Sequence, residues 1–198
     1  MCTKASLPTS RLAKLTLVRI RDADAARARI LRAATAEFAA HGIAGARVDR
    51  IAGDAEVAKE RIYAYFGNKD ALFDKVFAAT VRTTLDAVDF DADDLPGYAG
   101  RMFDYFADHP DAQRLTTWYR LERPQGPGLR AVINANDTRI AALAGRASAF
   151  SPVELLTLVQ AVAGSWGTMN PEFAGAAAAV GRPAQRAAII EAVRRLAA

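Results

Sequence analysis

Residues 48–73, VDRIAGDAEVAKERIYAYFGNKDALF, decide the fold that this sequence predicts. Apolar residues recur at helical spacing in two short segments, which predicts one helix over about 48–55 and another over about 59–66. Val57 lies between them and is expected to fill the turn. Two short helices joined by so tight a turn form a helix-turn-helix, and the second helix has the width of a DNA major groove.

The second of these helices has one face for a core and one face for solvent. Ile62 and Phe66 lie on the inner face, where they are expected to meet Ile30 and Phe38 of a preceding helix. Apolar residues of the first short helix complete this core: Ile51, Ala52 and Ala55. The outward face carries polar and small side chains: Lys59, Glu60, Arg61, Tyr63 and Ala64.

Longer helices are expected on both sides of this unit. One runs from about Asp24 to His41, and Gly42 ends it, because glycine is favoured just past a helix C-terminus. Another begins near Lys69 and runs to about Val88 with an apolar inner stripe.

The rest of the chain also has helical patterning. Asp94 is placed to cap a helix with Pro96 in its first turn, and Ser151 and Glu154 have the spacing of a capping box. No segment shows the alternation typical of β-strands, so the predicted fold class is all-α. The helix capped by Asp94 is expected to continue to about Phe106, and further helices are expected over about 108–121, 129–150, 153–166 and 184–197.

Charge is uneven along the chain. Residues 1–75 carry 14 Lys or Arg against nine Asp or Glu, whereas the remainder carries 12 against 13. A basic N-terminal third indicates a polyanionic partner. Residues 1–21 contain no acidic side chain and are broken by Pro8, so they are interpreted as a mobile basic arm. Two roles stay open for the arm: a tail without specific contacts, or added contacts to phosphates and the minor groove.

Cysteine usage and hydropathy limit the cellular compartment and the membrane association that the sequence allows. The single cysteine, Cys2, has no partner for an internal disulfide, which fits a reducing, cytoplasmic setting. The basic start is not followed by the apolar stretch and cleavage site of a signal peptide. No run of about 20 apolar residues occurs, so we expect no membrane partner.

The motif of the opening segment extends beyond the two short helices. Ile62–Phe66 reads Ile-Tyr-Ala-Tyr-Phe, Gly67 and Asn68 form a short break, and Lys69–Phe73 reads Lys-Asp-Ala-Leu-Phe. With the upstream helix that ends at Gly42, this composite resembles the signature of the tetracycline-repressor (TetR) family. The resemblance implies an N-terminal three-helix helix-turn-helix domain and a C-terminal helical domain for ligand binding and dimerisation.

The resemblance also implies domains and a function. We expect a basic arm over 1–21, a DNA-binding domain over 22–75, and a ligand-binding and dimerisation domain over 76–198. The implied function is that of a cytoplasmic transcriptional regulator, a repressor that binds a palindromic operator as a homodimer and is released by a small-molecule effector. Neither a cofactor nor a metal is implied.

Phosphate contacts carry over from the family by position. Tyr63 and Tyr65 are expected to donate their hydroxyls to phosphates, and Lys69 to bind another phosphate at a helix N-terminus. Arg47 is expected to contact the DNA backbone at the start of the helix over 48–55. For Tyr65 an alternative stays open, in which the ring is a half-buried part of the core.

Base contacts carry over to the start of the helix over 59–66. Lys59, Glu60 and Arg61 are expected to face base edges. Arg61 has the chemistry to bind guanine through two hydrogen bonds, and Glu60 can accept one from cytosine. Alternatively, Glu60 only complements the helix dipole.

The sequence departs from the family pattern at three positions. Glu56 occupies the turn position that is usually glycine, and a left-handed conformation there costs about 1–2 kcal/mol. Ala58 replaces the usual Ser or Thr cap, which costs about 1 kcal/mol. Ala46 replaces the usual threonine before the helix over 48–55. We therefore expect a recognition helix that is less stable or differently angled.

Two C-terminal helices are expected to form the dimer interface. Val153–Trp166 is apolar almost all round, and such a helix needs cover on two sides. Ala184–Ala197 carries small residues that allow close approach of a second helix. In the family these two helices make a four-helix interface, and a two-fold protein reads a palindromic site with both recognition helices.

Aromatic and apolar residues in the middle helices have two interpretations. They form either ordinary core or an apolar effector pocket with a few polar anchors such as Arg120 and Asn134. The candidate pocket residues are Tyr98, Met102, Phe103, Phe106, Trp118 and Tyr119.

Two other functions compete with the ligand-released repressor. One is a DNA-binding dimer that senses no small molecule. The other is a helical enzyme, which the sequence disfavours because the two histidines, His41 and His109, have no nucleophile or metal partner nearby in the chain.

Overall fold

The computed structural model describes the backbone of residues 11–198 and the side chains of residues 21–198. This part of the chain is helical and contains no strand, which confirms the all-α prediction. Two single-turn 3₁₀ helices, Ser165–Gly167 and Pro171–Phe173, follow the eighth α-helix. The α-helices are α1 (Arg11–Gly45), α2 (Val48–Asp54), α3 (Lys59–Phe66), α4 (Lys69–Ala87), α5 (Leu95–Asp108), α6 (Pro110–Glu122), α7 (Leu129–Ala142), α8 (Pro152–Gly164), α9 (Ala174–Val180) and α10 (Arg182–Leu196).

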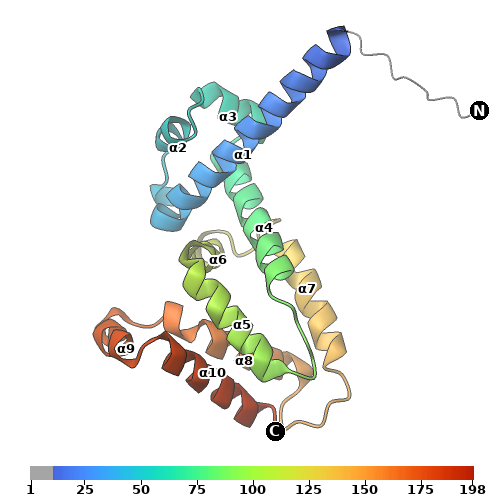
Figure 1. Cartoon of the computed structure of the whole chain (residues 1–198), viewed down its shortest axis with the longest axis vertical. Coiled ribbons are helices and arrows are strands. Elements are labelled where there is room, and N and C mark those ends of the chain that lie inside the picture. The colour runs from blue at the N-terminus through green and yellow to red at the C-terminus, as the bar shows by residue number, and fades with distance from the viewer. Residues whose placement is uncertain (1–10) are drawn as a thin grey trace, which may run out of the picture.

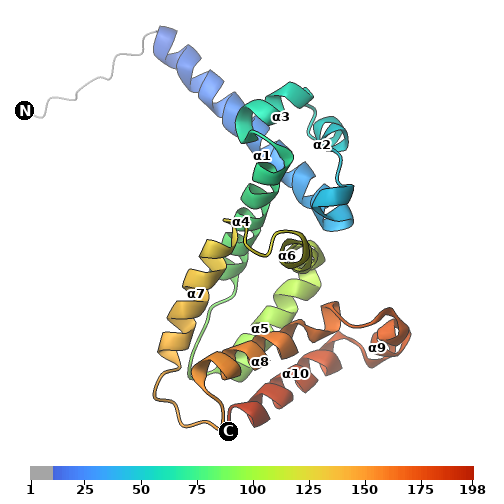
Figure 2. The ribbon, with the colours of Figure 1, turned by 180° about the vertical axis from the view of Figure 1, so that it is seen from behind.

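The helices form a small head and a larger body (Figure 1). The head consists of α1, α2, α3 and the first half of α4, and the N-terminal half of α1 extends past α2 and α3, away from the body. In the body, α5, α8 and α10 lie side by side, and the view from behind shows α7 alongside α4 (Figure 2). Helix α4 therefore belongs to both parts and is one path by which a change in the body can reach the head.

Each part has its own apolar core. The head core joins α1, α2, α3 and α4 and includes Leu115 and Tyr119 of α6. The body core joins α5, α8 and α10 with Leu143 from the segment after α7. The predicted packing of the helix-turn-helix is confirmed, since these residues are all buried: Ile30, Phe38, Ile51, Ala52, Ala55 and Ile62.

The start of the first helix differs from the sequence-based expectation. The predicted start near Asp24 is wrong because α1 begins at Arg11, three residues after Pro8. Leu, Arg, Lys and Ala dominate the segment, and a helix extends readily through such residues once its packed part has formed. The basic arm is thus helical from Arg11, and residues 1–10 lie outside the described residues.

Gly42 breaks the regular helix as predicted, although α1 continues to Gly45, whereas α7 ends earlier than expected. Gly42 interrupts α1 with a φ of 63°. Helix α7 ends at Ala142 rather than near Phe150, because the chain turns at Gly145, where φ is 80°. The short helix α9 was not expected in its glycine-rich segment.

Helix caps match the predictions closely. The Asp94 carboxylate accepts a hydrogen bond from the backbone N–H of Gly97 at 2.9 Å. The Ser151 and Glu154 capping box is present at the start of α8. Glu56 has a φ of 53°, and the Ala58 side chain provides no cap for α3, as expected. The two departures in the turn therefore weaken the start of α3.

Candidate nucleic-acid interface

Helix α3 presents one face to solvent and holds the other in the head core. Ile62 is 1% exposed, whereas Tyr63 is 41% exposed. The side chains of Glu60, Arg61 and Ala64 are also exposed. The structure therefore places the predicted outward residues on an accessible helix face, which is the arrangement that insertion into a DNA groove requires.

Lys59 is less available than its neighbours on α3. Its Nζ forms an ion pair with the Asp49 carboxylate of α2, with the nearest atoms 2.8 Å apart. The hydrogen bond to Asp49 raises the pKa of Lys59 above its ordinary value. A base contact from Lys59 requires this pair to break, so Glu60 and Arg61 are the better candidates for reading bases.

Tyr65 takes an intermediate position. Its ring is half-buried against the head core and lies edge-on to Phe66. The Arg27 guanidinium of α1 lies 4.8 Å from the ring centroid. The two interpretations of Tyr65 are therefore compatible, because the ring can pack on the head core while its hydroxyl donates to a phosphate.

Lys69 and Arg47 both lie near the start of α2. Lys69 donates a hydrogen bond from Nζ to the backbone oxygen of Ala46 at 3.2 Å, and Asn68 caps α4 by accepting from the backbone N–H of Ala71. The Arg47 side chain is exposed at the N-cap of α2. The N-termini of α2 and α4 and two cations thus lie at one end of the head, which is a setting for phosphate binding.

Glu37 organises this end of the head, and sequence reasoning gave it no role. The residue is 6% exposed, and its carboxylate accepts from the backbone N–H of Arg47 at 2.7 Å and from Nε of Arg50 at 2.9 Å. The hydrogen bond from Arg50 lowers the pKa of Glu37. Glu37 lies on the same helix face as Ile30 and Phe38, and an acidic residue on an apolar face is the signal that predicts a buried ion pair.

Comparisons with known proteins agree with this geometry. Residues 30–76 match the family described as bacterial regulatory proteins, tetR family, and residues 94–195 match the tetracyclin repressor-like C-terminal domain. The crystal structure of SCO4942 from Streptomyces coelicolor, described as a transcriptional regulator, is 41% identical in sequence with a TM-score of 0.77, over 85% of this chain and 96% of that chain. The chain belongs to the TetR family of transcriptional regulators.

Other TetR-like proteins extend the comparison. The HTH-type transcriptional repressor SCO4008 of Streptomyces coelicolor is 49% identical over 102 residues, which are 52% of this chain and 53% of that repressor. The match therefore spans about half the length of this curated relative. A transcriptional regulator from Rhodococcus has 17% identity and a TM-score of 0.67, over 85% of this chain and 94% of that chain, and supports the fold alone. Among the helices of residues 11–198, none is both long and apolar enough to cross a membrane.

In this TetR protein α6 holds the end of α1 in place. Trp118 and Arg114 of α6 both donate hydrogen bonds to the backbone oxygen of Ala39, at 3.2 and 3.0 Å. The Glu122 carboxylate accepts from the backbone N–H of Ile43. A Cβ at Gly42 would lie 2.8 Å from the Trp118 ring, so glycine permits this close approach. Trp118, a candidate pocket residue, thus packs between the head and the body.

A second contact joins α4 to the loop after α6. Tyr119 donates its hydroxyl to the Asp74 carboxylate at 2.6 Å and accepts from the backbone N–H of Gly128 at 2.9 Å. Arg123 donates two hydrogen bonds to the same carboxylate, at 2.8 and 2.7 Å. The Tyr119 ring is fully buried and stacks on Phe77 with centroids 3.9 Å apart. The structure therefore places Tyr119 in the head core.

Two neighbouring cavities lie in the body of this TetR protein. The inner cavity, about 130 Å³, is bounded by α4, α5, α6, α7 and α8, and the outer cavity, about 450 Å³, by α5, α6 and α8. Met102 and Phe106 line both cavities. Arg120 lines the outer cavity. Of the candidate pocket residues, Met102 and Phe106 are thus the ones that line these two cavities.

The remaining candidates lie elsewhere in the body. Tyr98 is buried in the body core, edge-on to Phe90, and burial raises the pKa of Tyr98. Phe103 and Phe106 line a further cavity of about 310 Å³ beside α10. Asn134, another polar candidate, is exposed on α7.

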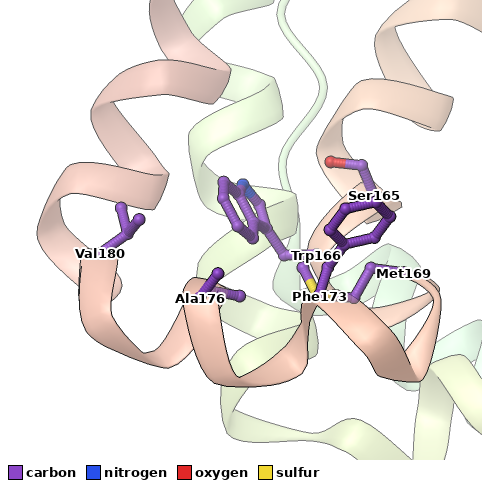
Figure 3. Close-up of a pocket in the computed structure, with 7 residues that line it drawn as sticks. Ser165, Trp166, Met169, Phe173, Ala176 and Val180 are labelled. Carbon is purple, nitrogen blue, oxygen red and sulfur yellow. The ribbon is translucent and has the colours of Figure 1, made fainter.

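A separate apolar pocket of about 390 Å³ lies between the end of α8 and α9 (Figure 3). Trp166, Met169 and Phe173 surround it, with Val180 at the far end of α9. Ser165 is its polar lining residue, and the lining contains no charged side chain. This pocket can hold apolar groups but offers little to orient a ligand.

The faces of α8 and α10 that point away from the body core are uncovered in the single chain. Val153 is 55% exposed, and Thr157 and Ala161, which also border the outer cavity, follow it along α8. Ala184, Ala187 and Ala188 are exposed on α10, which packs beside α8. The two helices predicted to dimerise thus carry small and apolar side chains on accessible faces.

Proposed function

We propose that the chain represses transcription by binding a palindromic operator as a homodimer, with α3 of each copy in the major groove, and that a small-molecule effector releases it. The observation that carries the proposal is the division of α3, which buries Ile62 and exposes Glu60, Arg61 and Tyr63. The repressor function of SCO4008 supports the same direction of regulation. A function on operator DNA requires a cytoplasmic location. The relatives of this chain are transcriptional regulators rather than enzymes.

The proposed DNA contacts form two groups: those that position the protein on the duplex and those that read the base sequence. Tyr63, Tyr65, Lys69 and Arg47 bind phosphates and fix the register of α3 on the duplex. Arg61 binds a guanine edge through its guanidinium fork, and Glu60 and Lys59 contact neighbouring bases. The first residues of α1 are rich in Lys and Arg, and we expect this segment to meet phosphates that flank the site bound by α3.

Operator affinities of variants test these roles. Tyr63→Ala and Lys69→Ala should weaken binding by a similar factor, roughly tenfold, on every operator sequence, because phosphate contacts carry no sequence information. Arg61→Ala should instead relax the preference at one base position in each half-site. The measurement is fluorescence anisotropy on a set of single-base operator variants, with Arg130→Ala on α7 as the exposed control. An unchanged base preference in Arg61→Ala would remove Arg61 as a reader.

The homodimer rests on the uncovered faces of α8 and α10. A second copy packed there would bury Val153, Ala161 and Ala188, which water contacts in the single chain. Burial of apolar area drives such association, and small side chains allow the helices to approach closely. Two copies related by a two-fold axis then present two α3 helices to one palindrome.

Effector release rests on the position of α4. Thr80, Val81, Thr84 and Leu85 of α4 line the inner cavity, and Lys69 begins the same helix. A ligand that fits the cavity better when α4 has moved shifts the protein toward a state whose two heads no longer match the operator. Thermal-shift screening combined with DNA-release assays tests this step. Ligands that bind without changing operator affinity would favour a dimer that does not use the cavity for regulation.

A further inference from the structure

The inner cavity contains a positive charge and no negative one. Its lining combines hydroxyl, amide and apolar side chains with a single guanidinium, that of Arg139, and contains neither Asp nor Glu. The lining residues are Thr80, Val81, Thr84, Leu85, Met102, Phe106, Thr116, Val132, Ala135, Asn136, Arg139 and Gln160. A charge beside a largely apolar, partly open space is costly unless an opposite charge, a polar group or water faces it.

Arg139 differs from the other half-buried arginines of the body. Arg186 is paired with Asp104, and Arg123 with Asp74. Arg139 instead lies over aromatic rings, 5.5 Å from the centroid of Phe90 and 5.4 Å from that of Tyr98. Within residues 21–198 it forms no ion pair. Its guanidinium is therefore held in place by rings while its hydrogen-bond donors stay available for an anion.

A second donor lies one helical turn away on α7. Asn136 accepts a hydrogen bond through Oδ1 from Nε2 of Gln160 at 3.1 Å. This bond orients the Asn136 amide, and its nitrogen donates to no other residue in the described part of the chain. A guanidinium and an amide N–H₂ on the same side of α7 form a pair of donors that suits the two oxygens of a carboxylate.

We propose that the inner cavity binds a small amphipathic monocarboxylate, with the carboxylate on Arg139 and Asn136. The apolar part of this ligand packs against Val81, Leu85 and Val132. The proposal names the chemical class of the effector and rests on the proposed function, in which the cavity is the effector site.

The size of the cavity limits the ligand. Its volume is about 130 Å³, so it accepts a short chain or a single ring. Met102, Phe106, Thr116 and Gln160 line both this cavity and the larger outer cavity, so a longer chain must pass between these side chains. Affinity should therefore rise about fourfold with each added methylene up to about six carbons and then level off, because each of these methylenes is buried in the cavity.

Direct binding to the full-length protein tests the class of ligand. The probes are hexanoate, hexan-1-ol and hexylammonium, which share one apolar chain and differ in the polar end. Isothermal titration calorimetry at neutral pH should show hexanoate binding roughly tenfold or more tightly than hexan-1-ol, because hydrogen bonds to charged groups are the stronger ones. Hexylammonium should bind most weakly. Equal affinity for all three probes, or no binding of hexanoate, would overturn the proposal.

Variants of Arg139 separate the charge from the fold. Arg139→Gln should lose the preference for hexanoate over hexan-1-ol, and Arg139→Lys should keep part of it. Arg130→Gln, on an exposed position of the same helix, should keep all of it. A full preference in Arg139→Gln would contradict the assignment, provided that circular dichroism shows an intact fold.

DNA release is measured separately with the same probes. Hexanoate that binds through Arg139 but leaves operator affinity unchanged would refute effector release and leave the ligand class standing. Loss of DNA binding with hexylammonium as with hexanoate would refute the ligand class and leave effector release standing.

Discussion

The head and the body of this protein differ in how completely one chain buries its apolar residues. In the described part of the head, Tyr63 is the large apolar side chain that remains exposed, and it lies on the face proposed to meet DNA. In the body, Leu121, Ile133, Val153, Phe173 and Val180 are all exposed. The head is therefore complete as a single copy, whereas the body has apolar surface that a second copy can cover.

Polar contacts show the same contrast. The head buries a carboxylate, Glu37, and surrounds it with donors from Arg47 and Arg50, which fixes the relative positions of α1 and α2. The body binds α5 to α10 with an exposed ion pair from Arg182 and a half-buried one from Arg186, and pairs that water can reach contribute little. A head whose first two helices are linked by a buried carboxylate can keep its shape while an effector changes the spacing of two heads.

The largest expected effect comes from breaking the pairing of two bodies. Ala161→Arg places a charge on the exposed face of α8, where a second copy would have to bury it. We expect monomers, and operator affinity lower by about 100-fold or more, because each head then binds its half-site without a linked partner. Size-exclusion chromatography with light scattering and anisotropy measure the two effects. Ala141→Arg on α7 is the matched control, and a dimeric Ala161→Arg would exclude this face from the interface.

The next largest effect is expected from a substitution at the junction between head and body. Gly42→Ala introduces a Cβ 2.8 Å from the Trp118 ring at a φ of 63°, so strain and overlap add. The free energy of unfolding should fall by about 3 kcal/mol. Gly145→Ala, at a φ of 80° with open space around it, should cost only about 1 kcal/mol. Equal losses in urea denaturation would show that the contact between α1 and α6 adds nothing.

Glu37, the buried carboxylate of the head, should give a smaller, acid-sensitive effect. Glu37→Gln should lower the free energy of unfolding by about 2 kcal/mol at neutral pH, since a hydrogen-bonded charge is lost opposite Arg50. The pKa of Glu37 is lowered in the folded protein, so its contribution is present above the ordinary glutamate pKa and disappears as the pH falls through the lowered value. The difference between wild type and variant should therefore shrink on acidification, whereas Glu60→Gln should change little at any pH.

The smallest effect is expected at the start of α3. Ala58→Ser supplies the missing cap and should raise the free energy of unfolding by about 1 kcal/mol. Ala64→Ser places the same hydroxyl in the middle of α3 and should give no gain. Thermal unfolding distinguishes the two variants, and equal shifts would mean that Ala58 does not limit the helix.

Local patterns predicted the head better than the body. The positions of Ile51 and Ile62 follow from helical spacing within one short segment, and the structure buries both. The aromatic residues of the middle helices have the same spacing whether they line a cavity or a core, so Met102 and Tyr119 could not be told apart. Their difference depends on contacts between distant segments, such as the bond from Gly128 to Tyr119.

Contacts between residues that lie far apart in the sequence explain the other features that the sequence did not predict. The role of Arg139 depends on its distance from Phe90 and Tyr98 and on the absence of an acid from one cavity wall, which no sequence window contains. The early start of α1 could not be predicted from Pro8 alone, because helix-forming residues follow directly from Arg11.

Hydroxyl-radical footprinting on the DNA that flanks the gene tests the central claim most directly. Wild-type protein should protect two patches of backbone related by a two-fold axis, and the protection should weaken steeply as salt rises. Tyr63→Ala should lose protection equally in both patches. A single unsymmetrical patch, or a Tyr63→Ala footprint identical to that of the wild type, would contradict the account of α3 as a recognition helix presented twice.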